Sequence, residues 1–300
     1  MKPGIYLDHK PVGVTSFTRV HALMREVEAA GLTRKQLPVC HGGTLDPFAE
    51  GLLLMLAGPA TQLMDWLHAA PKTYEAEVVW GVETDTGDGL GQAVHTGDTT
   101  HLTAPALEAA LQPFLGWTDQ VPPATSAKKL GGEPAYKKAH RGETVVLPPS
   151  RVYLHEARWL AHDLPRTSRL RLVCRGGYYV RALARELGRA LGCGAHLSRL
   201  HRTSIGPWAD PGPTGERVGV HGPAVLPWCP TRAIAGDEVN HLKHGRGIPR
   251  GDVRPATWSP PEGYPDPAGP VLAVQRGRLV ALLDDATETL RVRTHLWAGV

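Results

Sequence analysis

The segment from Cys40 to Gly51 has residue types and spacing that could do chemistry. It reads Cys-His-Gly-Gly-Thr-Leu-Asp-Pro-Phe-Ala-Glu-Gly, so two glycines and Thr44 stand between His41 and the carboxylate of Asp46. Adjacent glycines allow a tight turn in which the backbone approaches a ligand closely. A carboxylate behind such a turn can act as a nucleophile or stabilise developing charge. We therefore take Asp46 as the first candidate for a functional group.

The same segment has a purely structural interpretation. Asp followed by Pro and an apolar run is typical of a helix N-terminus, with Asp46 as the capping residue and Pro47 in the first turn. This pattern predicts a helix that starts at Pro47. His41, taken alone, is more often a loop histidine than a functional one. Residue spacing by itself leaves both interpretations of the segment open.

Charge is distributed unevenly along the chain, although the net charge is only +4. Residues 75–119 contain eight acidic side chains and neither Lys nor Arg, whereas residues 151–205 contain eleven arginines against three acidic residues. A second basic cluster lies at Lys128, Lys129, Lys137, Lys138 and Arg141, and tyrosines are interleaved at Tyr136, Tyr153, Tyr178 and Tyr179. Guanidinium groups beside stacking aromatics suit unpaired nucleic acid, so an RNA partner is favoured over a merely solvated surface.

Length and composition exclude several classes of protein. The chain has 300 residues, of which 42% are hydrophobic and 21% charged, as in ordinary globular proteins. Its longest apolar run, Leu52–Ala57, is far shorter than the ~18 residues of a membrane helix. The first residues lack the apolar core of a signal peptide, and the four scattered cysteines indicate reduced thiols. We expect a cytoplasmic protein that does not bind a membrane.

Hydrophobic periodicity predicts the elements that must position these residues. It predicts helices over 17–30, 61–69, 103–115 and 179–191, and strands over 74–80, 169–174 and 196–204. Their order indicates an α+β domain over residues 1–230. Within it, residues 119–149 combine Pro-Pro, Gly-Gly and the lysines and are typical of a long functional insertion. Short alternating segments over residues 231–300 predict a small β-rich domain.

Five motifs together resemble those of one family. His41–Gly51 resembles the His-Thr-Gly-Thr-Leu-Asp-Pro signature of TruB-type tRNA pseudouridine synthases. The other four stand in the family's order along about 200 residues: Leu7–Gly13, Lys72–Tyr74, Cys174–Arg181, and Leu191–Leu197 with Leu200–Arg202. The resemblance implies that residues 1–230 form a mixed, mainly antiparallel catalytic domain of the pseudouridine-synthase type, with residues 119–149 as an RNA-contacting insertion.

The resemblance also implies a reaction. A uridine in the T loop of tRNA, uridine 55, is flipped out of its stack, detached from its ribose and rejoined through C5 to give pseudouridine. The family does this without a cofactor or a metal ion. The expected partner is the tRNA T arm, no obligate protein partner is expected, and the protein is expected to be a monomer.

Particular residues acquire roles through the same resemblance. Asp46 matches the catalytic aspartate, Arg181 the arginine that orients it, and Tyr74 the tyrosine that holds the detached uracil. Tyr74 and Tyr179 could instead be half-buried strand residues, and Leu200 could be a core residue. The residues that match the lining of the RNA or base pocket are His41, Tyr179 and Leu200.

The chain departs from the family pattern at several positions. His9 is an extra residue within Leu-Asp-Lys-Pro and predicts a local bulge, while Lys10 is interpreted as a surface residue. Gly42 replaces a threonine, which removes a hydroxyl from the loop. In the insertion, Thr125–Lys129 stands where the family often has Tyr-Ser-Ala-x-Lys, and Glu133-Pro134 replaces basic residues. These departures concern RNA clamping rather than the chemistry.

The C-terminal region and the function each have a competing interpretation. Residues 241–249 resemble the turn that opens a PUA RNA-binding domain, and a small β cap without RNA contact is the alternative. A non-catalytic tRNA-binding or tRNA-folding protein on the same scaffold is the alternative to the enzyme. A glycoside or nucleoside hydrolase is a third class, but it needs two working carboxylates, and the motifs supply one.

Overall fold

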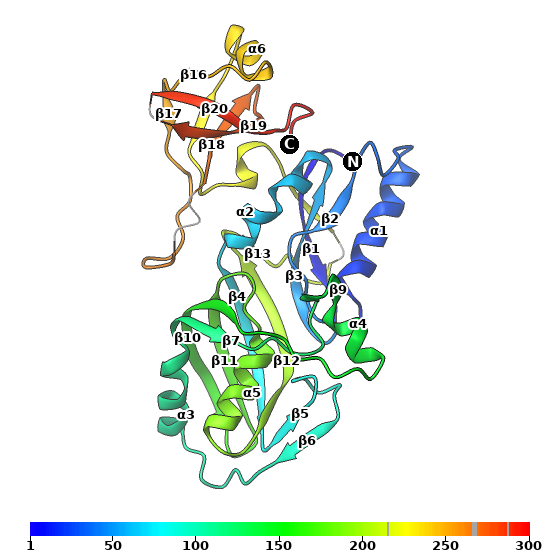
Figure 1. Cartoon of the computed structure of the whole chain (residues 1–300), viewed down its shortest axis with the longest axis vertical. Helices are drawn as coiled ribbons and strands as arrows, with labels where there is room; N and C mark the ends of the chain where they lie inside the picture. Colours follow the sequence, from blue (N-terminus) through cyan, green and yellow to red (C-terminus); the bar gives the residue numbers. More distant parts are fainter. Residues whose placement is uncertain (215, 266–268, 287) are drawn as a thin grey trace.

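One large sheet forms the centre of the chain in the computed structural model, which describes residues 1–214, 216–265, 269–286 and 288–300 (Figure 1). Its strand order is β14-β1-β3-β12-β4-β11-β10-β7, with β2 beside β3 and β13 beside β12. All neighbours are antiparallel except β3 and β12, which confirms the predicted mixed, mainly antiparallel α+β sheet. The strands are β1 (Gly4–Lys10), β2 (Val39–His41), β3 (Glu50–Ala57), β4 (Lys72–Trp80), β7 (Gly116–Gln120), β10 (Ser150–Asp163), β11 (Thr167–Cys174), β12 (Ala195–Ile205), β13 (Trp208–Ala209) and β14 (Val218–Val220).

Helices pack around this sheet where the periodicity predicts them. In α1, Thr15 caps the first turn by accepting a hydrogen bond from the Thr18 N–H, and Val20, Leu23 and Val27 form the buried face. Thr103 caps α3 in the same way. The helices are α1 (Ser16–Ala29), α2 (Met64–Ala69) after the 3₁₀ turn η1 (Gly58–Leu63), α3 (Ala104–Leu111) before η2 (Gln112–Phe114), α4 (Ala135–His140) and α5 (Val180–Ala190). In the described part of the chain, none is long and apolar enough to cross a membrane.

The helix predicted from Pro47 is wrong. Residues 47 and 48 form a single turn, closed by a 3.1 Å hydrogen bond from the Ala49 N–H to the Asp46 carbonyl, and strand β3 begins at Glu50. The apolar run Leu52–Ala57 is completely buried, because α1 packs against one face of β3 at Leu53 and Met55, and a second apolar cluster covers Leu52, Leu54 and Leu56 on the other face. A strand covered on both faces has a continuous apolar sequence, which periodicity cannot distinguish from a buried helix.

The bulge predicted at His9 is also wrong. Strand β1 keeps an unbroken register with β3, and His9 lies opposite Leu52. The His9 Nδ1 lies 2.9 Å from a carboxylate oxygen of Asp210 on one face of the sheet. The next residue, Lys10, points to the other face and is fully buried, so its interpretation as a surface residue is wrong as well.

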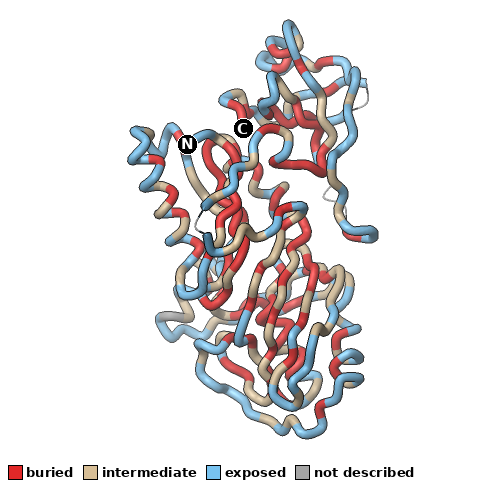
Figure 2. The backbone as a smooth tube through the Cα atoms, turned by 180° about the vertical axis from the view of Figure 1, so that it is seen from behind, coloured by how far each residue is buried: buried red, intermediate tan, exposed pale blue. Residues whose placement is uncertain are grey.

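A second, smaller sheet lies at the C-terminal end of the chain. Its order is β16-β20-β19-β18-β15-β17, and a short helix, α6 (Asp237–Lys243), accompanies it. Leu272 and Leu282 of this sheet share one apolar cluster with Ile5 and Leu56 of the large sheet, and the buried residues in Figure 2 follow both sheets. The strands are β15 (Thr231–Ala233), β16 (Ile248–Pro249), β17 (Val253–Arg254), β18 (Val271–Gln275), β19 (Arg278–Ala286) and β20 (Thr289–His295), and the 3₁₀ turn η3 is Gly222–Val225.

Two small hairpins complete the fold. The first, β5 (Val82–Thr84) with β6 (Ala93–Thr96), follows β4 directly. The second, β8 (Lys129–Leu130) with β9 (Glu133–Pro134), lies with α4 inside residues 119–149, between the large-sheet strands β7 and β10. The segment predicted to be a long helical or loop insertion therefore contains the helix α4 and, in addition, a short hairpin.

The acidic and arginine-rich stretches of the sequence partly neutralise each other in space. The acidic strand β4 lies beside β11, so Arg169 pairs with Glu75 across these neighbouring strands, and Arg189 of α5 pairs with Glu83 of β5. The two charged stretches are therefore partly paired with each other, while other arginines pair with carboxylates of their own stretch. Eight of the eleven arginines of residues 151–205 form ion pairs: Arg151, Arg158, Arg166, Arg169, Arg171, Arg181, Arg185 and Arg189.

Candidate active site

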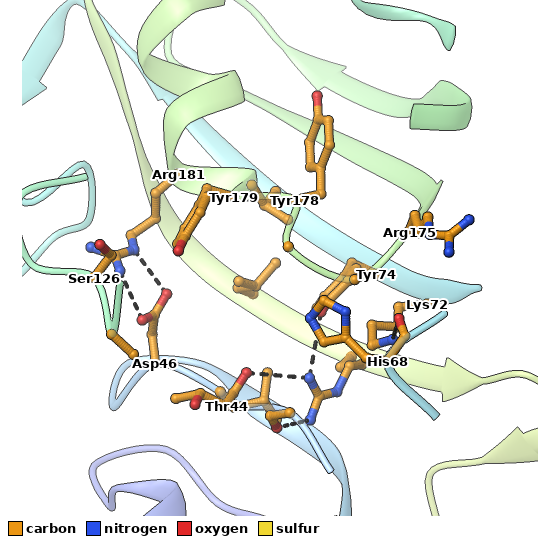
Figure 3. A pocket seen from close by; sticks show the side chains of 18 of the residues that line it. Thr44, Asp46, His68, Lys72, Tyr74, Ser126, Arg175, Tyr178, Tyr179 and Arg181 are labelled. Atoms are coloured by element: carbon orange, nitrogen blue, oxygen red, sulfur yellow. Dashed lines mark hydrogen bonds and ion pairs between the residues drawn. The ribbon is translucent and has the colours of Figure 1, made fainter. Parts of the chain in front are cut away.

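A pocket of about 340 Å³ opens on the face of the large sheet that carries the motif residues (Figure 3). The loop 43–46, strands β4 and β12, the turn before α5 and the segment 126–128 form its walls. Five of the six residues singled out from the sequence line this one pocket although they lie up to 154 positions apart: Asp46, Tyr74, Tyr179, Arg181 and Leu200.

Asp46 and Arg181 form a bidentate ion pair at one end of the pocket. The Arg181 Nε and one terminal nitrogen each donate to a different Asp46 oxygen at 2.8 Å. The other terminal nitrogen donates to the Thr86 carbonyl at 2.7 Å and the Thr125 hydroxyl at 2.8 Å, so the guanidinium cannot rotate. The Arg181 side chain is 3% exposed and that of Asp46 is 29% exposed. The pair thus holds one carboxylate in a fixed plane and leaves part of it open to the pocket.

Helix α5 places Arg181 in its first turn. Strand β11 ends at Cys174, and a turn through Gly177, whose φ is +91°, leads to Tyr179 as the N-cap residue. Tyr179 supplies no side-chain cap. The side chain of Gln120, the last residue of β7, instead bonds both the N–H and the carbonyl of Tyr179. A buried amide from the insertion boundary therefore fixes the start of the helix.

Two buried side chains hold the loop that carries Asp46. Arg202 donates to the carbonyls of Gly43 and Thr44 at 3.1 and 3.3 Å. Ser16 accepts from the Leu45 N–H at 2.9 Å and donates to the Leu45 carbonyl at 3.1 Å. Since both side chains are at most 2% exposed, the loop has little freedom on the side away from the pocket.

Tyr74 and Leu200 form part of the pocket floor. They are 7% and 6% exposed and belong to the apolar core of the large sheet. Burial raises the pKa of the Tyr74 hydroxyl above its usual value, while Arg202, 3.5 Å from that oxygen, lowers it in part. The phenol is therefore a neutral group at physiological pH, able to donate or accept a hydrogen bond.

Tyr179 lies beside the Asp46–Arg181 pair, whereas Tyr178 points away from it (Figure 3). Tyr179 is half-buried, and burial raises its pKa. Both residues line the pocket, but the Tyr178 ring is buried in the core and points away from Asp46 (Figure 3), so Tyr179 is the one whose ring lies beside the carboxylate.

His41 does not line the pocket. It ends strand β2, and its Nδ1 accepts a long hydrogen bond of 3.4 Å from the Gly43 N–H. Burial lowers the pKa of His41, and the nearby Arg202 lowers it further. His41 therefore contacts the Asp46 loop from behind, and its contact with RNA stays a prediction.

Three buried cations around the site had no assigned role in the sequence analysis. Arg202 and Lys72 line the pocket, and Lys10 lies behind the Asp46 loop, where it donates to the Pro11 and Val14 carbonyls. Burial lowers the pKa of Lys72 to about 7 and that of Lys10 to about 8. All three residues lie inside motifs that resemble those of the family, so the sequence did contain a signal that could have identified them.

Gln120 and Ser16 carried no comparable signal in the sequence. Their contribution depends on the Tyr179 and Leu45 backbones, which lie 59 and 29 positions away along the chain.

Among the residues that the structure describes, no three His, Cys, Asp or Glu side chains are placed to share a metal ion.

Comparisons with known proteins agree with this architecture. A family model described as "TruB family pseudouridylate synthase (N terminal domain)" matches residues 32–180, and one described as "tRNA pseudouridylate synthase B C-terminal domain" matches residues 181–218. A tRNA pseudouridine synthase B from Thermobifida fusca is 34% identical over 292 residues, which cover 93% of this chain and 96% of that relative.

Another relative matches more closely over a shorter region. The tRNA pseudouridine synthase B of Xanthomonas campestris is 42% identical over 210 residues, which cover 69% of this chain. The match spans 65% of the length of that relative. A chain in the solved structure titled "Crystal Structure of a Cbf5-Nop10-Gar1 Complex" has a TM-score of 0.66 at 21% identity, over 98% of this chain and 84% of that one. At that identity the likeness establishes a shared fold.

Proposed function

The chain belongs to the TruB family of pseudouridylate synthases, and we propose that it isomerises a uridine of tRNA to pseudouridine. One observation carries the proposal: the bidentate Asp46–Arg181 pair lies at the end of a pocket that is also lined by Tyr74, Tyr179 and Leu200. A carboxylate, an aromatic floor and a bound cation are what a site needs to hold a detached base beside its ribose.

The proposed reaction balances within one nucleotide. The bond between uracil N1 and ribose C1′ breaks, the base turns, and a bond forms between C5 and C1′. The hydrogen on C5 leaves as a proton and N1 gains a proton, so no oxidant, reductant or second substrate is consumed. Asp46 is the group that meets the sugar or the base, and Arg181 keeps its carboxylate in the reactive orientation.

The target base must first leave its stack. Flipping a base costs a few kcal/mol, which contacts inside the pocket must offset. Tyr179 offers a ring to the incoming base, while Tyr74 and Leu200 supply the floor. The Tyr74 hydroxyl, kept neutral by burial, is the group we assign to proton movement at the base.

We assign uridine 55 in the T loop as the target, and residues 1–230 as the catalytic part. Its insertion, residues 119–149, is assigned to RNA contact because Ser126, Ala127 and Lys128 already line the pocket. Residues 231–300, with their six-stranded sheet, are assigned as a PUA-like RNA-binding module. We further expect the protein to act as a monomer, which sedimentation of the purified chain would test.

Replacement of Asp46 tests the function directly. Asp46→Asn keeps the size of the side chain and one acceptor oxygen but removes the charge. We expect it to abolish pseudouridine formation in a T-arm transcript, read by carbodiimide modification and primer extension, while RNA binding survives. Full turnover by Asp46→Asn would overturn the assignment of Asp46. If the wild-type chain binds the transcript and leaves the uridine unchanged, the non-catalytic RNA-binding alternative is correct.

A further inference from the structure

Arg175 is an arginine without a partner at the pocket. Eight arginines of residues 151–205 form ion pairs, and a ninth, Arg202, donates to backbone carbonyls. Within the described residues, the Arg175 guanidinium makes no ion pair and no hydrogen bond, although its side chain lines the pocket. An unpaired guanidinium at the edge of a cavity is suited to bind an anionic ligand.

Arg175 lies at the end of the pocket opposite the Asp46–Arg181 pair. Figure 3 shows Arg175, His68 and Lys72 together at that end, and Asp46, Arg181 and Ser126 at the other. His68 is exposed to the pocket and its ring has no hydrogen-bond partner in the part of the chain that the structure describes. The two ends of the cavity thus differ: one holds the Asp46–Arg181 ion pair, and the other holds cationic and hydrogen-bonding groups that form no ion pair among the described residues.

The backbone next to Arg175 forms a tight turn packed against His68. A Cβ atom at Gly176 would lie 2.3 Å from the His68 carbonyl and 2.8 Å from its ring, so only glycine fits there. The N–H groups of Gly176 and Gly177 donate no hydrogen bond within the described residues, and both glycines line the pocket. Successive free N–H groups in a turn with a positive φ form a concavity that binds anions.

We infer that Arg175, His68 and the Gly176–Gly177 backbone form a subsite for one phosphodiester of the RNA, next to the nucleotide whose base enters the pocket. Lys72, buried behind these groups, adds positive potential when it is protonated. The subsite binds phosphate rather than a base, because its groups are donors and the aromatic rings lie elsewhere in the pocket. This inference rests on the proposed function, since it presumes that the pocket receives a nucleotide of an RNA strand.

The subsite sits where it could set the register of the strand. A phosphate fixed at the Arg175 end, together with a base held near Asp46 at the other, would determine which nucleotide is presented to the carboxylate. Phosphate contacts of this kind carry no base information, so Arg175 is expected to affect affinity equally for all T-arm sequences.

Single neutral linkages in the RNA provide the test. T-arm oligonucleotides are prepared with one methylphosphonate at a time around the target uridine, and their dissociation constants are measured by fluorescence anisotropy. We expect one linkage beside the target to weaken binding to the wild-type chain by about tenfold, since that is the order of one charged hydrogen-bonded contact. In Arg175→Gln the same linkage should have no further effect, and the slope of log affinity against log salt should fall by about one.

Arg199→Gln is the matched control. Arg199 lies in the same arginine-rich stretch, is exposed on β12 and also has no ion pair in the described structure, but it does not line the pocket. It should keep the tenfold sensitivity to the same linkage. If Arg175→Gln keeps that sensitivity as well, or if no single linkage matters, the subsite is overturned. Conversion of the unmodified T arm by the wild-type chain is measured in parallel. If the subsite is overturned but the wild-type chain forms pseudouridine, the proposed function stands. If the wild-type chain forms no pseudouridine, the proposed function is refuted.

Discussion

The side-chain amide of Gln120 makes a reciprocal pair of hydrogen bonds with the backbone of Tyr179. Gln120 Nε2 donates to the Tyr179 carbonyl at 3.1 Å, and the Tyr179 N–H donates to Gln120 Oε1 at 2.9 Å. Because Tyr179 caps α5 and Arg181 follows two residues later, this amide controls where the guanidinium meets Asp46. Gln120 is 2% exposed, so water cannot replace it.

Gln120→Met should therefore reduce catalysis more than RNA binding. Methionine has a similar size but cannot bond the Tyr179 backbone, and a misplacement of about 1 Å in a catalytic group can cost about 10²-fold in rate. We expect kcat to fall ten- to a hundredfold (an order-of-magnitude range) with little change in the dissociation constant for T-arm RNA. Single-turnover conversion and anisotropy measure the two quantities.

Ser168→Ala is the control for a general loss of stability. Ser168 is 1% exposed and accepts a hydrogen bond from the Trp80 indole, away from the pocket. It should lower the midpoint of thermal unfolding and leave kcat unchanged at temperatures where both variants are folded. Equal loss of kcat in the two variants would show that Gln120 acts only through stability.

Arg181→Lys should nearly eliminate turnover. A lysine ammonium is a point charge that cannot donate in parallel to both Asp46 oxygens and also reach the Thr86 carbonyl and the Thr125 hydroxyl. Losing a bidentate, buried pair costs about 2–4 kcal/mol, which corresponds to about 30- to 10³-fold in kcat. Pre-steady-state conversion of the T-arm transcript measures the rate. A kcat within threefold of wild type would contradict the orienting role of Arg181.

Ser16→Ala should loosen the Asp46 loop. The substitution leaves the Leu45 N–H buried without a partner, which costs about 1–3 kcal/mol of stability. Urea unfolding measures this loss, and kcat should fall because the Asp46 backbone gains freedom. Thr18→Ala, an exposed substitution on the same helix, should leave both quantities close to wild type. An unchanged unfolding midpoint in Ser16→Ala would refute this explanation of the loop.

Lys72 should make stability depend on pH. Burial lowers its pKa from 10.5 in the unfolded chain to about 7 in the folded protein, so between these values the unfolded chain binds more protons. The free energy of unfolding then rises with pH, by at most about 1.4 kcal/mol per pH unit. Lys72→Met is the reference protein, because it lacks the contribution of Lys72 to the pH dependence of unfolding and keeps that of Lys10. The difference between the two proteins should grow from about pH 7 to about pH 8, where ordinary thiols are still mostly protonated.

Urea unfolding at several pH values checks the Lys72 prediction. Burial raises the pKa of the Cys174 thiol to about 12, which lowers stability at higher pH; because Lys72 itself partly lowers that pKa, the two proteins are compared only up to about pH 8, where thiols are mostly protonated. Lys35→Met, an exposed lysine, should run parallel to wild type. Parallel curves for Lys72→Met and wild type would contradict the lowered pKa.

RNA binding should weaken as salt rises, because phosphate contacts release counterions. The slope should reflect a limited number of contacts, since most arginines of residues 151–205 are already paired with carboxylates. Anisotropy titrations of T-arm RNA over a range of salt concentrations measure it. A flat response would contradict phosphate contact altogether.

Much of this protein could be predicted from local patterns. Helices α1, α3 and α5 and strands β4, β11 and β12 follow from periodicity, because capping threonines, terminal glycines and alternating apolar residues act over a few positions. The spacing of the motifs identified the family and singled out Asp46, Tyr74 and Arg181 as candidates. These signals are local, so one chain is enough to read them.

Only the tertiary structure determined which residues lie close enough together to form the site. The apolar run after Asp46 became a strand because β1 and β12 pair with its two edges and two separate apolar clusters cover its faces, and the capping role of Asp46 disappeared with the helix. Arginines of residues 151–205 meet carboxylates of the acidic stretch, as Arg169 meets Glu75 across β11 and β4, whereas Arg175 at the pocket forms no ion pair in the described structure. Sequence determines which groups a segment carries, but burial and electrostatic energy depend on neighbours that only the folded chain brings within a few ångströms.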